Sequence, residues 1–150
     1  METAIRLEHI SKKFLSTGDS EYSLALTDIS FEIEKGSFTI VAGANGSGKS
    51  VLMNLISGLM KPSEGKITVS SKVGLVFQEA STQILGDTPR EDVAVGLKNL
   101  KTPKKEIPAL AENALKKVNL LSKADFPAEF LSGGEKRRLA VASILAMKRD

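Results

Sequence analysis

The chain has 150 residues, of which 41% are hydrophobic and 26% are charged, the composition of an ordinary globular domain. The net charge of +3 is too small to indicate nucleic acid binding by itself, and the absence of cysteine excludes disulfides and thiolate metal sites. No apolar run is long enough to span a membrane and the N-terminus does not resemble a signal peptide, so we expect a cytoplasmic protein.

The N-terminal third is predicted to be β-structure. Residues 4–10 and 26–33 alternate apolar and polar side chains, as half-buried strands do. Residues 38–42 are a nearly continuous run of apolar and β-branched side chains, which favours a strand buried on both faces. Two more strands are expected at residues 67–69 and 73–77, joined by a very short turn. His9, the single histidine, falls in the first strand, where we expect a structural role.

Helices follow the glycine-rich segment after residue 42. The first is expected at residues 49–56 and closes at Gly58. The sequence Thr88-Pro89-Arg90-Glu91 predicts a capping box at the start of the next helix, with proline at its first position. One apolar stripe at three- and four-residue spacing predicts an amphipathic helix; it contains Ile107, Leu110, Ala111, Ala114, Leu115 and Val118. A final helix is expected at residues 139–147.

Residues 43–50 match the G-x-x-x-x-G-K-[ST] pattern of a phosphate-binding loop, between a predicted strand and a predicted helix. Glycines let such a loop turn its N–H groups toward phosphate oxygens, and the helix adds its positive N-terminal end. Lys49 would contact the β- and γ-phosphates and assist catalysis, and the Ser50 hydroxyl would ligate Mg²⁺. The predicted nucleotide-binding residues here are Gly43, Asn45, Gly46, Ser47, Gly48, Lys49, Ser50 and Val51. The alternative is a glycine-rich turn without a ligand.

A second glycine-containing motif, Leu131-Ser132-Gly133-Gly134-Glu135, opens the last helix. The N–H groups of its glycines, the Ser132 hydroxyl and the helix N-terminus could together face a phosphate. The alternative is a hinge with Ser132 as an ordinary N-cap.

The phosphate-binding loop and this second motif together resemble the nucleotide-binding domain of ABC transporters. In that family, the Leu-Ser-Gly-Gly-Gln signature of one subunit caps the γ-phosphate held by the loop of another. The resemblance therefore implies ATP and Mg²⁺ as ligands, nucleotide contacts from Ser132, Gly133, Gly134 and Glu135, and a second ATPase subunit, identical or paralogous, as a partner. Glu135 stands where the family usually has glutamine.

Three further residues acquire roles through this resemblance. Gln78 matches the family's Q-loop glutamine, which touches Mg²⁺ and the attacking water and couples to the membrane subunit; alone, it would be a solvated surface residue. Phe14 falls where the family stacks an aromatic ring on adenine, and its alternative is a buried core residue. Tyr22 is a weaker candidate for the same contact.

The sequence is also similar, more specifically, to the ATPases of energy-coupling factor transporters, including the cobalt type, which take up vitamins or transition-metal ions. Gln83, residues 91–97 and the run Lys136-Arg137-Arg138 carry this likeness. It extends from about residue 4 to residue 150, although the stretch between Val69 and Val73 is shorter than the family's hairpin region. It implies an integral membrane transporter subunit as partner and a peripheral location at the inner face of the cell membrane, with no nucleic acid partner.

The implied fold class is α/β, a P-loop NTPase of the ABC type with an N-terminal antiparallel β region. Its core would occupy residues 1–78, a helical subdomain residues 79–127, and the signature motif with its helix residues 128–150. The family's catalytic carboxylate comes from a strand ending Asp-Glu beyond that helix, and this sequence stops at Asp150 before any such strand. We therefore expect a fragment without its C-terminal core strands, inactive alone, with apolar surface exposed near residues 38–42.

Two other functions remain open from the residues alone. One is a soluble ABC-type ATPase that acts on nucleic acid or ribosomes. The other is an unrelated P-loop protein, such as a kinase or a GTPase, with an accidental match to the signature. A GTPase should contain a guanine-reading Asn-Lys-x-Asp motif, and the sequence has none.

Overall fold

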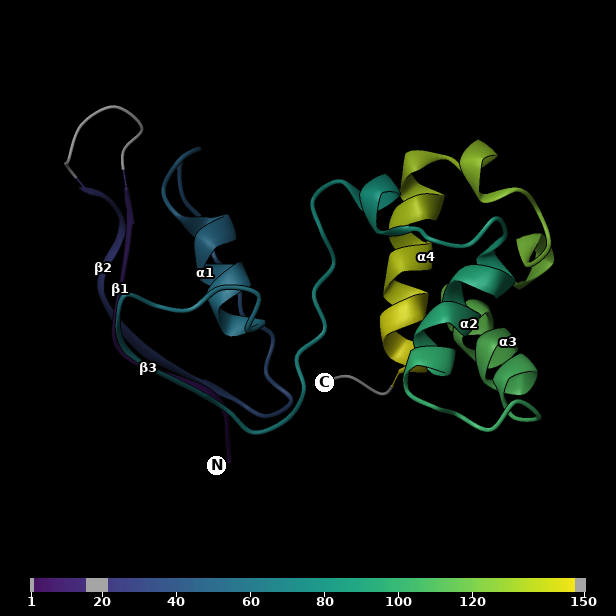
Figure 1. Ribbon diagram of the computed structural model, residues 1–150, viewed down its shortest axis with the longest axis horizontal. Helices are drawn as coiled ribbons and strands as arrows, with labels where there is room; N and C mark the ends of the chain where they lie inside the picture. The colour runs from purple at the N-terminus through teal and green to yellow at the C-terminus, as the bar shows by residue number, and fades with distance from the viewer. Residues whose placement is uncertain (1, 16–21, 148–150) are drawn as a thin grey trace. The chain divides into compact units, whose positions relative to one another are not determined.

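The computed structural model describes residues 2–15 and 22–147 of the chain (Figure 1). The chain forms two compact units, Met1–Val73 and Gly74–Asp150, and each unit has a hydrophobic core of its own. Within the described residues, no helix is both long and apolar enough to cross a membrane. These two units are defined by the contacts within each of them. The division into a core at residues 1–78, a helical subdomain at 79–127 and a signature segment at 128–150 stays a prediction.

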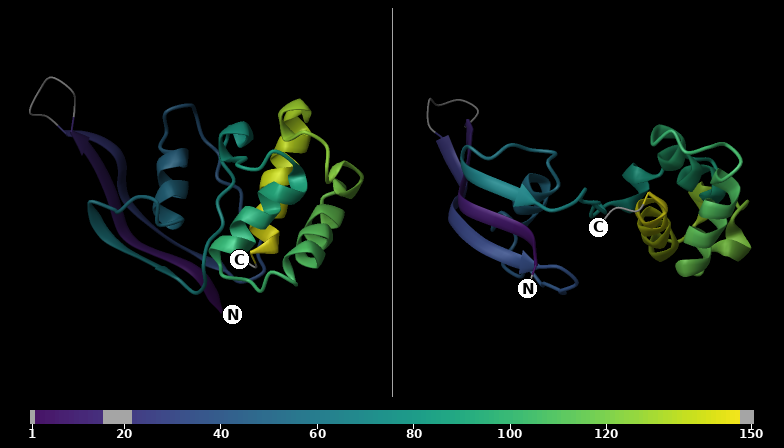
Figure 2. Two further views of the ribbon diagram at one scale, coloured as in Figure 1. Left: turned by 45° about the vertical axis from the view of Figure 1, so that its right-hand side comes forward. Right: turned by 90° about the horizontal axis from the view of Figure 1, so that it is seen from below.

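The first unit is a three-stranded antiparallel sheet with one helix beside it (Figures 1 and 2). Its elements are β1 (Thr3–Leu15), β2 (Tyr22–Glu34), α1 (Lys49–Ile56) and β3 (Glu64–Val69), and the strand order is β2-β1-β3. The core joins the helix to the sheet and contains Leu7, Ile10, Leu26, Leu52, Leu55 and Ile56. The predicted strands at residues 4–10, 26–33 and 67–69 are confirmed, as is the helix at residues 49–56.

Two predicted strands, at residues 38–42 and 73–77, are wrong: neither belongs to a hydrogen-bonded ladder among the described residues. Phe38 and Ile40 are 90% and 76% exposed, so the segment is not buried on both faces, and the exposed apolar surface expected near residues 38–42 is confirmed. Apolar and β-branched residues favour an extended backbone, but a strand also needs a neighbour to pair its N–H and C=O groups. The predicted hairpin after residue 69 is likewise absent, because β3 pairs with β1 instead.

His9 lies at an irregularity in the pairing of β1 with β2. His9 and Asp28 both have positive φ angles, 52° and 49°, and the His9 Nδ1 atom lies 2.7 Å from the Asp28 Oδ1 atom. The His9 side chain is 81% exposed. The residue thus ties two distorted strands together, in keeping with the expected structural role.

The second unit is built from three helices that pack on one another (Figure 2). They are α2 (Pro89–Asn99), α3 (Ile107–Lys117) and α4 (Gly133–Ala146), with short turns η1 (Ala80–Gln83), η2 (Leu121–Lys123) and η3 (Ala128–Phe130). The predicted apolar stripe of α3 faces this core, since Ile107, Ala111, Ala114 and Leu115 are buried. The last helix begins earlier than residue 139, because Ser132 caps it.

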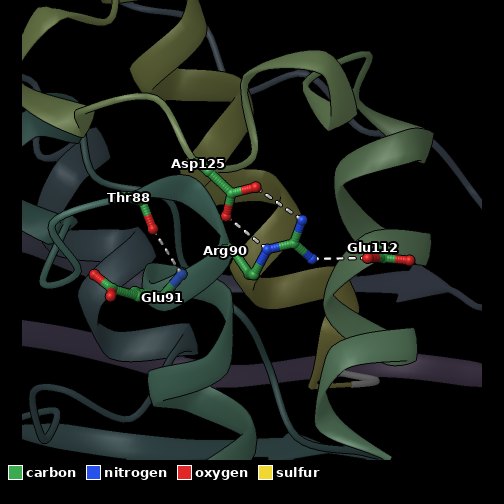
Figure 3. Close-up of polar contacts among 5 residues, drawn as sticks. All are labelled: Thr88, Arg90, Glu91, Glu112 and Asp125. Atoms are coloured by element: carbon green, nitrogen blue, oxygen red, sulfur yellow. Dashed lines mark hydrogen bonds and ion pairs between the residues drawn. The ribbon is translucent and has the colours of Figure 1, made fainter.

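An arginine on α2 holds three segments of this unit together (Figure 3). Arg90 donates from Nε and Nη2 to the Asp125 carboxylate at 2.8 and 3.1 Å, and from Nη1 to Glu112 Oε1 at 2.8 Å. These bonds lower the pKa of Asp125 and raise the pKa of Arg90. Nearby, the Thr88 hydroxyl accepts a bond from Glu91 N, which is the first half of the predicted capping box; the return bond from Glu91 is not formed among these residues.

A buried carboxylate fixes α2 against two further segments. Asp92 is only 5% exposed. Its Oδ1 atom accepts from Leu85 N at 2.7 Å and from Gly86 N at 3.2 Å, while its Oδ2 atom accepts from the Ser143 hydroxyl at 2.7 Å. Because each of the two side-chain oxygens of Asp92 accepts at least one hydrogen bond, the side chain can be buried without an unpaired polar atom.

Candidate nucleotide-binding site

The predicted phosphate-binding loop connects residue 42 to the first turn of α1. Gly46 and Gly48 have φ angles of 82° and 86°, a left-handed conformation that side chains with a Cβ rarely adopt. A Cβ on Gly48 would also lie 2.6 Å from the backbone oxygen of Ala25, on β2. The loop can therefore approach the sheet this closely only with glycine at position 48.

Lys49 occupies the centre of this loop. Its ammonium group donates to the carbonyl oxygens of Gly43 and Ala44, at 2.9 and 2.7 Å, and lies 3.4 Å from the Ser47 hydroxyl. The loop thus curls around the one positive charge that its motif contributes. A ligand with several phosphate oxygens could meet that charge and the loop backbone together.

The N-terminus of α1 offers free hydrogen-bond donors. Gly48 is the N-cap and makes no side-chain cap, and the first turn of the helix carries no acidic residue. The first N–H groups of a helix have no partner within it, so here they and the helix dipole are available to an anion. Ser50 is exposed in this turn and Val51 is half-buried, while Asn45 and Ser47 are exposed in the loop.

The two aromatic candidates lie at adjoining ends of β1 and β2, where Phe14 pairs with Ser23 and Leu15 with Tyr22. Phe14 is 39% exposed, with the Lys12 ammonium 5.2 Å from the centre of its ring. The alternative of a buried core aromatic is therefore wrong for Phe14. Tyr22 is 66% exposed, so both rings are accessible.

The second predicted motif forms a complete capping box. The Ser132 hydroxyl accepts from Glu135 N at 3.3 Å, and the Glu135 carboxylate accepts from Ser132 N at 2.9 Å. A serine hydroxyl that accepts one bond still has its own proton to donate, so capping does not prevent contact with a phosphate. Gly133 and Gly134 are exposed, and a Cβ on either would meet no atom within 4 Å. The N-cap interpretation is thus confirmed, and the phosphate-binding interpretation stays open beside it.

Lys123 neutralises the charge of Glu135, a contact that the sequence did not predict. Its ammonium lies 2.6 Å from Glu135 Oε1. This bond, together with the bond from Ser132 N, lowers the pKa of Glu135 to about 2. The glutamate therefore stays ionised and paired, which limits its repulsion of an anion near Ser132. Lys123 reaches it through the turn at residues 121–126, and no spacing rule in the sequence places that turn.

We expect the pairing of Glu135 to make stability depend on acid pH. A carboxyl with a pKa of about 2 in the folded chain and 4.5 as its reference stabilises the fold fully above pH 4.5, and loses that contribution as pH falls toward 2. The Glu135→Gln variant should therefore show a shallower loss of unfolding free energy across this window, measured by urea unfolding at several pH values. Parallel curves for the two proteins would contradict this prediction.

Gln78 lies in the second unit, in an irregular segment before η1. Its side chain is exposed, and its backbone oxygen accepts from Arg137 Nη2 at 3.3 Å. Gln83 is nearby and binds the same segment through Leu75 O and Phe77 N. The predicted site residues therefore divide between the units: residues 43–51 and the aromatic candidates are in the first, and Gln78 and residues 132–135 are in the second.

Comparison with known proteins gives related chains in several bacteria. An energy-coupling factor transporter ATP-binding protein, EcfA1, of Staphylococcus saprophyticus is 36% identical over 162 aligned positions, which cover 99% of this chain and 59% of that protein. EcfA1 of Fusobacterium nucleatum is 43% identical over 134 positions, which cover 80% of this chain and 51% of the relative. The chain thus spans between half and two thirds of the length of these relatives.

Solved structures share the fold as well. CbiO1 from Clostridium perfringens, described as part of the ABC transporter complex cbiONQ, aligns with a TM-score of 0.83 and 30% identity, over 99% of this chain and 63% of its own. The ATP-binding cassette MJ0796, solved as a dimer with ADP and phosphate, aligns with a TM-score of 0.85 and 28% identity, over 97% of this chain and 70% of its own. The family model for ABC transporters matches residues 26–150. The chain therefore belongs to the ABC transporter family, and its fold is that of the family's P-loop ATPase domain.

Proposed function

We propose that this chain binds ATP as part of the ATP-binding subunit of an importer of the energy-coupling factor type. The observation that supports this most directly is the loop at residues 43–50, with Lys49 at its centre and the uncapped N-terminus of α1 beside it. That combination supplies a cation, loop amides and a helix dipole to one polyanion. The relatives named above are ATP-binding proteins of such transporters.

Each site residue has a proposed role in this activity. Lys49 contacts the β- and γ-phosphates, and Ser50 and Gln78 hold Mg²⁺. The described residues contain no cluster of three His, Cys, Asp or Glu side chains that could hold a metal. Mg²⁺ would neutralise charge on the phosphates there. Phe14 stacks on adenine, and Ser132, Gly133, Gly134 and Glu135 face the γ-phosphate bound to a second ATPase subunit.

Hydrolysis and transport belong to the full-length protein in this proposal. A polypeptide of residues 1–150 should bind Mg-ATP weakly without turnover. Glu135 is held by Ser132 N and Lys123, so it is not free to act as a catalytic base. The complete subunit would act as a dimer on the inner face of the cell membrane with an integral membrane subunit. Its cargo would be a small solute such as a vitamin or a transition-metal ion.

Copurification tests the assignment to a transporter. The full-length protein, tagged and extracted from membranes with mild detergent, should bring down a hydrophobic integral membrane protein and hydrolyse ATP. A Lys49→Ala variant prepared in the same way should retain the partner and lose turnover. Recovery with ribosomes or nucleic acid alone would instead favour a soluble ATPase that acts on those partners.

A further inference from the structure

The segment that carries Gln78 is held by side chains of its own unit, since it belongs to no sheet among the described residues. The Gln83 amide donates from Nε2 to Leu75 O at 2.9 Å and accepts at Oε1 from Phe77 N at 3.0 Å. Leu75 O and Phe77 N therefore both face the Gln83 side chain. One glutamine amide, with its donor and its acceptor, therefore replaces a neighbouring strand for this short stretch.

A second attachment follows at the next residue. Arg137 donates from Nη2 to Gln78 O at 3.3 Å. Arg137 lies in the second turn of α4, the helix that Ser132 caps and whose first residues are Gly133 and Gly134. The neighbouring Glu79 accepts from the Ser81 hydroxyl at 2.6 Å, and among the described residues no hydrogen bond joins its carboxylate to Arg137. The backbone from Leu75 to Gln78 is thus bonded both to Gln83 of η1 and to Arg137 of α4.

We propose that Gln83 and Arg137 are positioning residues that hold the Gln78 side chain in place for ATP hydrolysis, and that Arg137 links this position to the signature helix. The proposal rests on the proposed function of Gln78. Because Arg137 and the phosphate-facing residues share one helix, a shift of the start of α4 on contact with nucleotide would also move the carbonyl that Arg137 holds. Contact of the signature motif with nucleotide and alignment of the Gln78 side chain would then occur together.

The test uses the full-length protein assembled with its partners. Arg137→Ala should lower kcat about ten-fold, which corresponds to losing one hydrogen bond from a charged donor. The Kd for Mg-ATP and the Tm should change little, since neither the phosphate-binding loop nor the core is touched. Gln83→Ala should show the same pattern. Arg138→Ala is the matched control, because it removes another exposed cation from the same turn that has no bond to Gln78 among the described residues, and its kcat should stay near that of the wild type.

A double-mutant comparison separates positioning from a general structural role. In a Gln78→Ala background, Arg137→Ala should cause no further loss of kcat, because the side chain that it positions is gone. An equal loss in both backgrounds, or a loss no greater than that of Arg138→Ala, would overturn the proposal. Failure of the wild-type protein itself to bind or hydrolyse Mg-ATP would instead refute the proposed function.

Discussion

Replacing Lys49 by alanine is expected to weaken Mg-ATP binding by about 10- to 100-fold, the range for losing a hydrogen bond from a charged donor. Two effects add. The ammonium no longer meets the phosphates, and the loop loses the bonds from Lys49 to Gly43 O and Ala44 O that hold its curl. Isothermal titration of the full-length protein with Mg-ATP measures the change directly.

Lys66→Ala provides the control for charge. Lys66 is exposed on β3 and forms no ion pair among the described residues, so its loss lowers the net charge equally without touching the loop. Its Kd for Mg-ATP should stay near that of the wild type. If both variants bound Mg-ATP as the wild type does, the assignment of residues 43–50 to a nucleotide would be wrong.

Gly48→Ala is expected to destabilise the first unit strongly. The new Cβ would stand 2.6 Å from Ala25 O and 2.7 Å from Leu26 Cδ2, so α1 or β2 must move. Crowding of this kind costs about 1–3 kcal/mol beyond the cost of the left-handed backbone itself. Binding of Mg-ATP should fail as well, because the start of α1 moves with the loop. Urea unfolding of the full-length protein gives the free energy.

Gly36→Ala measures the free-energy cost of the left-handed backbone conformation without a clash. Gly36 has a similar φ of 72°, but a Cβ there would meet no atom within 4 Å. This variant should lose only the cost of the left-handed conformation, about 1–2 kcal/mol. Equal losses in the two variants would mean that the contact between residue 48 and β2 contributes nothing.

Local signals predicted the helical parts of the chain well. The glycine-rich loop ends at Gly48 and α1 runs over the predicted residues, because the motif specifies its own turn and helix start. The apolar stripe after residue 107 likewise faces a core. The start of α4 was predicted too late from periodicity, since residues 133–138 carry no apolar side chain; Ser132 and Glu135 were the better signal.

The sequence did not predict which distant segments pair with one another. Residues 38–42 have a strand composition, yet the chain alone does not say which segment would pair with them, and the described residues supply none. The contacts that shape the site in the second unit are equally non-local. Lys123 reaches Glu135 and Arg137 reaches Gln78 only after the helices have packed, so neither partner follows from spacing along the chain.

The buried Asp92 also determines how freely the second unit can rearrange. Sliding α4 by one turn past α2 would carry the Ser143 hydroxyl away and leave the buried Asp92 Oδ2 atom without its donor, while Oδ1 kept its two backbone bonds, at a cost of about 1–3 kcal/mol. Apolar side chains alone would tolerate such a slip far better, because one methyl group replaces another. The hydrogen bond between Asp92 and Ser143 thus favours one register of α4 against α2. The unit should respond to a load by tilting as a whole, with its internal alignment preserved.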